Sequence, residues 1–183
     1  MGEKATNIIK QANAALEENL SQLANYEHHI LDINTELLKI PNFHLSEKIL
    51  IEEFDNLIRP LRQNFKNKPC IYFFEFKKGE AKVIRDAYKN LNQNNKSALK
   101  KTLNNDTTCL YVGRSKGTII NRLKAHLGYK NTTENAMQLL HWAKPLKLQL
   151  KLNIFIFPKE LDFLLPLYEA TFHKNYKPLI GHL

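Results

Sequence analysis

Three short runs of strand-like sequence in the second half of the chain constrain its fold more than any other feature. They cover residues 69–76, 108–113 and 146–157. The first two are rich in aromatic and β-branched residues, and the third begins as an alternation of Leu with polar residues, which is typical of a half-buried strand. With the helical patterns between and after them, the order β–β–α–α–β–α predicts an α/β fold with a small three-stranded antiparallel sheet flanked by helices. Antiparallel pairing of the first two strands would place Cys70 and Cys109 at opposite ends, so we expect no disulfide between them.

Helices are predicted where apolar residues recur every three or four positions between capping or breaking residues. In this half of the chain the predicted helices are residues 81–88, 118–128, 133–142 and 159–175. Pro166 lies inside the last range, and it predicts a kink or restart there because proline cannot donate a backbone hydrogen bond.

The first 65 residues predict an all-helical segment that precedes a domain over residues 66–183. Five apolar residues recur every seven positions, namely Ile9, Leu16, Leu23, Ile30 and Leu37. A second helix is predicted from Ser46, a good N-cap, to Pro60. The heptad spacing favours a coiled coil that pairs two chains into a homodimer, a docking helix, or an amphipathic helix packed on its own chain.

The charge of the chain is distributed unevenly along its length. The formal net charge is +9, but residues 1–60 hold 5 basic and 10 acidic groups, while residues 61–183 hold 22 basic and 8 acidic groups. Such an excess attracts polyanions, so nucleic acid, and DNA in particular, is the expected partner. The alternatives are a solubilising charge or a positive face that the acidic segment covers. A basic insertion over residues 77–107 is either a flap over a nucleic-acid backbone or a solvated loop.

Several classes of protein are excluded by what the sequence lacks. It has no apolar run long enough to span a bilayer, and no secretory signal. Two cysteines without a CxxC or Cys/His cluster argue against a disulfide framework or a zinc site, so we expect a soluble cytoplasmic protein. Walker-type phosphate loops and the serine-hydrolase elbow are absent as well.

The residues that remain for chemistry form an ordered series in the second half of the chain. The series is Cys70-Ile71-Tyr72, Tyr111-Val112-Gly113, Arg122, His126, Glu169 and Tyr176-Lys177-Pro178. This order and spacing resemble the successive motifs of the GIY-YIG nucleases over about residues 69–183. The whole series is much more specific than any of its parts.

The resemblance implies a DNA endonuclease that hydrolyses phosphodiester bonds with one divalent ion, Mg²⁺ or Mn²⁺. Tyr111 is implied as general base or water-orienting group, with Tyr72 hydrogen-bonded beside it. Arg122 would stabilise the scissile phosphate, because its guanidinium is planar and permanently charged. His126 would bind phosphate or relay a proton, and Glu169 would hold the ion.

Three features of this chain depart from the family pattern. The glycine of the first motif is replaced by Cys70, and the tyrosine motifs lie unusually far apart because of the insertion. The polar residue expected shortly after Pro178 falls at or near Gly181, with His182 next to it. The alternative function is therefore a catalytically inactive module that binds nucleic acid or a protein partner.

Overall fold

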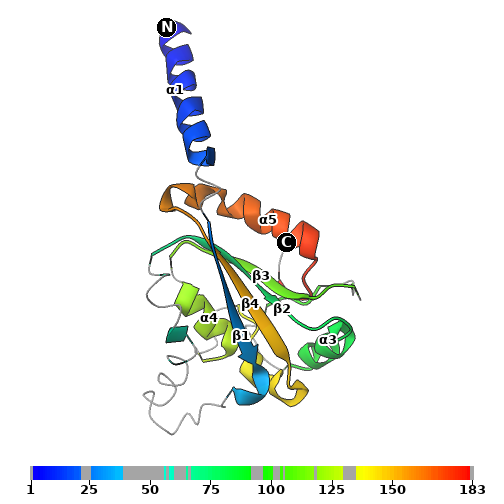
Figure 1. Cartoon of the computed structure of the whole chain (residues 1–183). Helices are drawn as coiled ribbons and strands as arrows, with labels where there is room; N and C mark the ends of the chain where they lie inside the picture. Colours follow the sequence, from blue (N-terminus) through cyan, green and yellow to red (C-terminus); the bar gives the residue numbers. More distant parts are fainter. Residues whose placement is uncertain are drawn as a thin grey trace.

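The computed structural model describes residues 2–21, 26–38, 56, 58–59, 65, 67–91, 97–100, 104, 106–117, 119–129 and 135–181. Its α-helices are α1 (Gly2–Ser21), α3 (Ala81–Lys89), α4 (Ile119–Leu127) and α5 (Leu165–Tyr176) (Figure 1). Its strands are β1 (Glu27–Asn34), β2 (Cys70–Glu75), β3 (Cys109–Ser115) and β4 (Gln149–Ile156). Short 3₁₀ segments are η2 (Thr35–Leu37), η3 (Leu139–His141), η4 (Lys144–Leu146) and η5 (Lys159–Leu164).

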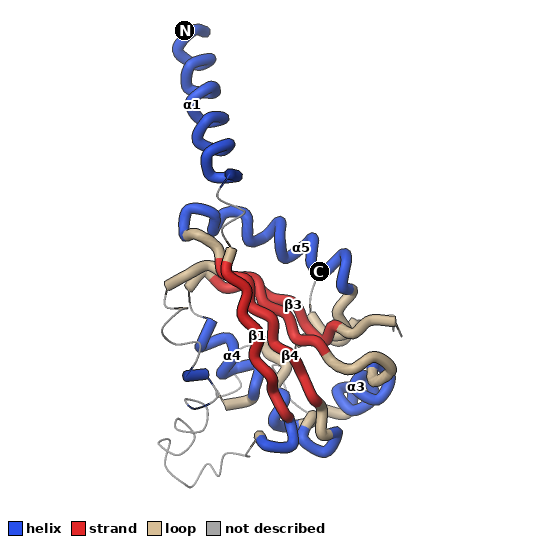
Figure 2. Tube along the Cα trace, in the orientation of Figure 1, coloured by secondary structure: helices blue, strands red, loops and turns tan. Residues whose placement is uncertain are grey.

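The strands form one antiparallel sheet in the order β1-β4-β2-β3 (Figure 2). The α/β class and the strands expected around residues 70, 110 and 150 are confirmed. β2 lies inside the sheet, which is why nearly all of its residues are buried and apolar. The register pairs Cys70 with Ser115 and Glu75 with Cys109, so the two cysteines lie at opposite ends of the β2–β3 pair as expected.

The expected three-stranded sheet and all-helical N-terminal segment are wrong, because β1 is a fourth strand. The helix α1 ends at Ser21, and β1 pairs with β4 from Glu27–Ile156 to Asn34–Gln149. Along β1 the side chains of Leu31 and Ile33 turn toward the core while the intervening residues are exposed, which is a period of two. The heptad spacing concealed that alternation.

Two other predicted helices have different outcomes. The helix expected over residues 133–142 is wrong over its described part, where η3 forms instead. Gln138 has a positive φ of 54°, and the backbone N–H of Met137 donates to a side chain rather than to a helical carbonyl. The helix predicted from Ser46 to Pro60 lies outside the described residues except for Asn56, Ile58 and Arg59, which are helical.

Two layers of helix cover the sheet. Tyr72 and Phe74 of β2 face the main core together with Leu123 and Leu127 of α4. Ile71 and Phe73, which point the other way, pack with residues of η5 and α5, so the sheet lies between α4 and α5 (Figure 1). The helix α1 extends away from the sheet, and its described side chains are exposed. No helix in the described part of the chain has the length and apolar character needed to cross a bilayer.

Candidate active site

The centre of the candidate site is a buried hydrogen bond between Tyr72 of β2 and His126 of α4. Tyr72 Oη lies 3.0 Å from His126 Nε2, and both side chains are completely buried. The other ring nitrogen, Nδ1, accepts a hydrogen bond from the backbone N–H of Met137 at 3.3 Å. Because that backbone group can only donate, Nδ1 carries no proton, and the neutral ring must donate from Nε2 to Tyr72. Burial and the charge of Arg122 hold the pKa of His126 well below its usual value, which keeps the ring neutral.

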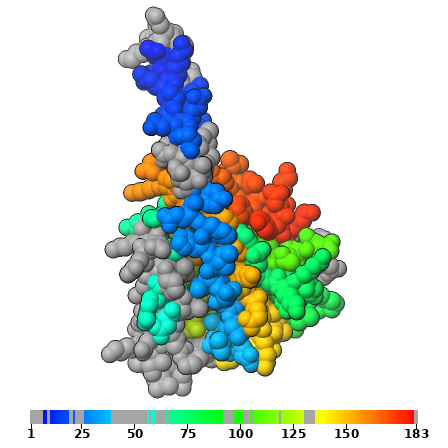
Figure 3. All heavy atoms as spheres, viewed as in Figure 1, coloured from blue at the N-terminus to red at the C-terminus, as the bar shows by residue number. Residues whose placement is uncertain are grey.

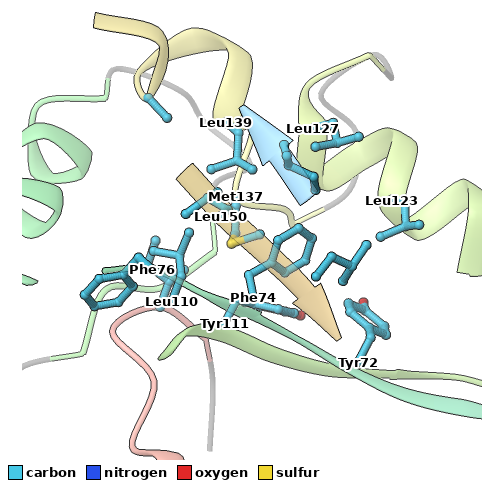
Figure 4. Close-up of a cluster of buried hydrophobic side chains, with 14 of the residues drawn as sticks. Tyr72, Phe74, Phe76, Leu110, Tyr111, Leu123, Leu127, Met137, Leu139 and Leu150 are labelled. Carbon is cyan, nitrogen blue, oxygen red and sulfur yellow. The ribbon is translucent and has the colours of Figure 1, made fainter. Parts of the chain in front are cut away.

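Tyr111 lies on the same face of the sheet beside this pair. Its ring centroid is 6.2 Å from that of Tyr72 and 4.4 Å from that of His126. Figure 4 shows both phenol rings on the side of the sheet where Leu123 and Leu127 of α4 lie. Tyr111 retains 9% of its surface exposed and Tyr72 none, so Tyr111 is the phenol that a substrate can approach.

Gly113 allows the two tyrosines to pack this closely. It is the register partner of Tyr72 across the β2–β3 pair. A Cβ atom at this position would lie 2.7 Å from both Tyr111 Cε1 and Tyr72 Oη, which is too close for any side chain. The glycine after Tyr111-Val112 is therefore needed for space.

Arg122 of α4 lies within hydrogen-bonding reach of both phenols. Burial raises the pKa of Tyr111, whereas Arg122 and a hydrogen bond from Tyr72 lower it without cancelling that effect. Burial and then Tyr111 raise the pKa of Tyr72 well above its ordinary value, although Arg122 opposes this. Tyr111 is therefore the easier phenol of the pair to ionise, with Tyr72 as the donor that stabilises its phenolate.

Glu169 comes from α5, the helix that covers the opposite face of the sheet. Its Oε2 accepts a 2.8 Å hydrogen bond from Nε of Arg114, and the two groups form an ion pair. Arg114 is three residues after Tyr111 on β3, so its side chain points to the α5 face. The negative charge of Glu169 also raises the pKa of Tyr111, although burial is the larger cause. The candidate site thus spans both faces of β3.

The fit of a divalent ion to Glu169 depends on the donors around it. In the part of the chain that the structure describes, no group of three or more His, Cys, Asp or Glu residues can hold a metal ion. Mg²⁺, however, commonly binds through one or two carboxylates and keeps water and substrate phosphate as its other ligands. The side chain of Glu169 is 23% exposed and therefore accessible to such an ion. A single ion shared with a phosphate fits the residues present.

The C-terminal segment reaches Tyr111 at Gly181. A Cβ built on Gly181 would lie 3.6 Å from Tyr111 Cε2 and 3.4 Å from His173 Cε1. Gly181 has a φ of +126°, which L-residues rarely adopt, so glycine is also favoured by its backbone. His182 lies outside the described residues.

Two charged or polar neighbours were missed by reasoning from sequence, namely Arg114 and His173. Arg114 follows Tyr111 at an odd offset, which indicates the opposite face of a strand, and His173 is one helical turn after Glu169. These two spacings are visible in the sequence, but the packing of α5 against β3 could not be predicted from it. His173 is nearly buried, and burial and the charge of Lys100 lower its pKa.

The described part of the basic insertion approaches the same end of the site. Lys100 N donates to Leu179 O, and Gly181 N donates to Ala98 O, so residues 97–100 run beside the C-terminal segment. Most of the remaining insertion beyond α3 lies outside the described residues. The insertion therefore brings at least one basic residue, Lys100, close to His173.

Comparisons of the chain with protein-family models, curated proteins and solved structures found no match.

Proposed function

We propose that the protein is a DNA endonuclease of the GIY-YIG type that depends on one divalent metal ion. The observation that carries this proposal is the convergence of two phenols, a neutral histidine and an arginine on one side of β3, with a carboxylate from the other side. The residues of this cluster are up to about a hundred positions apart in the sequence. They are the residues of the motif series described in the sequence analysis. The positive charge of residues 61–183 supports DNA as the partner.

Tyr111 takes the proton of the attacking water in this mechanism. Its neutral form is favoured at rest because burial raises its pKa, so it becomes a base only when surrounding charge stabilises the phenolate. Arg122 supplies part of that stabilisation and directs its guanidinium at the phosphate, where charge develops in the transition state. Tyr72 holds the oxygen of Tyr111 in place.

His126 acts through Tyr72 and does not contact the substrate. It is completely buried and both ring nitrogens are engaged, so of its two implied roles the phosphate contact does not fit. Its fixed donation from Nε2 orients the hydroxyl of Tyr72 toward Tyr111. His126 is therefore a positioning residue.

Glu169 would hold the divalent ion together with a phosphate oxygen of the substrate. When bound, the ion would neutralise charge on the phosphate and the leaving oxygen, and it would offset the effect by which Glu169 raises the pKa of Tyr111. Arg114 keeps Glu169 oriented through its 2.8 Å hydrogen bond to Oε2.

A second candidate function is a catalytically inactive module that binds nucleic acid. The observation in its favour is Gly181, which offers no side chain beside Tyr111 where the family pattern has a polar group. The retained set of Tyr111, Arg122 and Glu169 favours the nuclease, since binding alone requires no carboxylate in a basic site.

The test is cleavage of supercoiled plasmid and branched DNA by the full chain with Mg²⁺, Mn²⁺ or EDTA. We expect metal-dependent cutting that Tyr111→Phe and Glu169→Ala each reduce by at least about a hundredfold. Tyr88→Phe is the control for the first variant, because Tyr88 is a buried tyrosine whose Oη donates to Ser97 O. Asp162→Ala is the control for the second, because Asp162 is also paired with a basic residue, Lys116.

The outcomes separate the two candidates. Cutting that requires metal and is lost in both site variants but not in the controls would support the nuclease. Absence of cutting with DNA binding retained in all five proteins would instead support the binding module.

A further inference from the structure

The outer edge of β1 is open in the described part of the chain. On its inner side β1 pairs with β4 along all eight residues without a bulge. On its outer side, no backbone hydrogen bond among the described residues reaches it. The backbone N–H and C=O groups of successive residues point alternately to the two edges of a strand. An unpaired edge of this length therefore carries several free N–H and C=O groups.

The sequence of β1 has few of the devices that protect an edge strand, since its only charged residues are Glu27 and Asp32. It reads Glu-His-His-Ile-Leu-Asp-Ile-Asn, without lysine or proline. Near its middle, Ile30 is 59% exposed although it is apolar and β-branched. Figure 3 shows the atoms of residues 26–38 as a continuous strip on the molecular surface. An open, regular and partly apolar edge of this kind favours pairing with another strand.

We propose that two copies of this chain pair antiparallel through β1, about a two-fold axis at Ile30. In this register Ile30 lies opposite Ile30 of the partner subunit, and His28 lies opposite Asp32 of the partner subunit. On the face that carries these residues the strand is thus self-complementary, with apolar against apolar and an imidazole against a carboxylate, as a two-fold interface requires. On the other face Glu27 lies opposite Ile33 of the partner subunit and His29 lies opposite Leu31 of the partner subunit. Centring the axis on Leu31 would place Asp32 opposite Ile30, and centring it on His29 would place that residue opposite itself.

The side chains of β1 and β4 are already arranged for this pairing. His28 Nε2 donates to Asn153 Oδ1 at 3.0 Å, and its ring stacks on Phe155 with centroids 4.2 Å apart. His28 therefore loses little conformational entropy when a partner strand arrives. Asp32 is the register partner of Lys151, so in the dimer it would lie between Lys151 and His28 of the partner subunit.

Pairing through β1 would join two four-stranded sheets into one of eight strands. The β3 strands would form its outer edges, and the candidate active sites would remain unobstructed. The β1 edge is distinct from the apolar positions of α1 that favour a coiled coil. The proposed β1 dimer does not depend on the proposed nuclease activity.

The first experiment is disulfide cross-linking of the full-length Ile30→Cys variant under mild oxidation. Opposite residues of an antiparallel pair have Cα atoms about 4.5–5.5 Å apart, which suits a disulfide. The native thiols do not compete, because Cys70 and Cys109 are buried and burial raises the pKa of Cys70 to about 12. The control is Val83→Cys, on α3, because Val83 is also β-branched and 54% exposed.

We expect Ile30→Cys to form covalent dimer at least about ten times faster than Val83→Cys. Equal rates for the two variants would overturn the proposal. Rapid cross-linking of Leu16→Cys on α1 without that of Ile30→Cys would do the same, since it would assign the contact to α1.

The second experiment is light scattering of the unmodified protein and of Asp32→Lys over about 1–200 µM. We expect the unmodified chain to dimerise and Asp32→Lys to raise the dissociation constant at least about tenfold. Asp86→Lys is the control, because Asp86 is an exposed acid on α3 and should leave the dimer unchanged. A monomer at every concentration of the unmodified chain would contradict the proposal.

Discussion

The two edge strands of the sheet, β3 and β1, differ in almost every property. β3 is covered on its outer side by the C-terminal segment, through hydrogen bonds from Leu179 N to Cys109 O and from Ile180 N to Leu110 O. It carries the candidate site, with Tyr111 on one face and Arg114 on the other. Among the described residues, β1 carries no such cluster and has no backbone partner on its outer side.

This difference teaches how one small sheet can separate two tasks. Perturbed pKa values require burial and nearby charge, and a covered edge strand between two helical layers provides both. Strand-to-strand association requires exposed backbone groups and exposed side chains, which the edge of β1 provides among the described residues. We therefore expect substitutions around β3 to change chemistry and substitutions around β1 to change stability or assembly only.

The largest effect is expected from Arg122→Ala. Removal of the guanidinium takes away the cation that lowers the pKa of Tyr111 and the donor for the phosphate. Single-turnover cleavage of plasmid should fall by about a thousandfold or more. Arg122→Lys keeps the charge but not the planar fork, so it should give an intermediate rate. Cleavage by Arg122→Ala within tenfold of the unmodified protein would show that the phosphate is held elsewhere.

The next effect is expected from Gly113→Ala, which tests the packing of the two phenols. The added Cβ would lie 2.7 Å from Tyr111 and Tyr72, so the pair has to separate. We expect the free energy of unfolding to fall by about 1–3 kcal/mol and cleavage by about a hundredfold.

Gly79→Ala is the matched control for that substitution. Gly79 also disfavours a side chain, because its φ is +96°, but a Cβ there meets nothing within 4 Å. It should lose about 1 kcal/mol of stability and no cleavage activity. Equal loss of cleavage in the two variants would show that stability alone explains the effect at Gly113.

Much of the fold on the β3 side could be predicted from the sequence, and the β1 side could not. The residues of β2, β3 and β4 form uninterrupted apolar or alternating runs that only strands explain well. The residues of β1 also continue a seven-residue apolar spacing from α1. This spacing is typical of a helix but does not exclude a strand, so the sequence alone did not reveal β1. Pairing with β4, across more than a hundred residues, decided between them.

The candidate site was predicted through its motifs, but its connections were not. Tyr72, Tyr111, Arg122 and His126 were singled out, and the structure brings them together on one side of β3. The tautomer of His126 depends on the backbone of Met137, in a segment that was expected to be helical. Such contacts depend on tertiary structure, which local patterns do not contain.

The dependence of cleavage on pH tests the assignment of Tyr111. Its pKa is raised above its ordinary value of 10, and the active form of a base is the ionised phenolate. Below that pKa the phenolate fraction, and with it the single-turnover rate, should rise about tenfold for each pH unit. Tyr72→Phe removes a hydrogen bond that lowers the pKa of Tyr111, so its profile should shift to higher pH. Between about pH 6.5 and pH 8.5 Tyr111 is mostly protonated. A single-turnover rate that did not change with pH in this range would exclude a phenolate base.

A smaller effect is expected on stability in acid, through His126. Its pKa is lowered in the folded protein, so on acidification the unfolded chain takes up a proton that the folded chain does not. The free energy of unfolding should therefore decrease as the pH falls below about 6.5, by up to about 1.4 kcal/mol per unit for this residue. His173 and His141, whose pKa values are also lowered, act in the same direction. Urea unfolding of His126→Gln between about pH 7.5 and pH 5 should show a shallower slope, and an unchanged slope would assign the effect to the other two histidines.

The smallest effect, and the one that tests the separation of the two edges most directly, is expected from Asn153→Ala on β4. Asn153 Nδ2 donates to Glu75 Oε2 at 2.8 Å, and its Oδ1 accepts from His28 Nε2, so it links the β1 side of the sheet to β2. The variant leaves both partners without this contact and should lose about 1–2 kcal/mol in urea unfolding. Cleavage should not change, because the printed bonds of Asn153 go to Glu75 and His28, which are not site residues, and the phenols and Arg122 lie on the other face. If cleavage fell as far as it does in Gly113→Ala, the two edges would be coupled through β2 and β4, and the separation of tasks between them would be wrong.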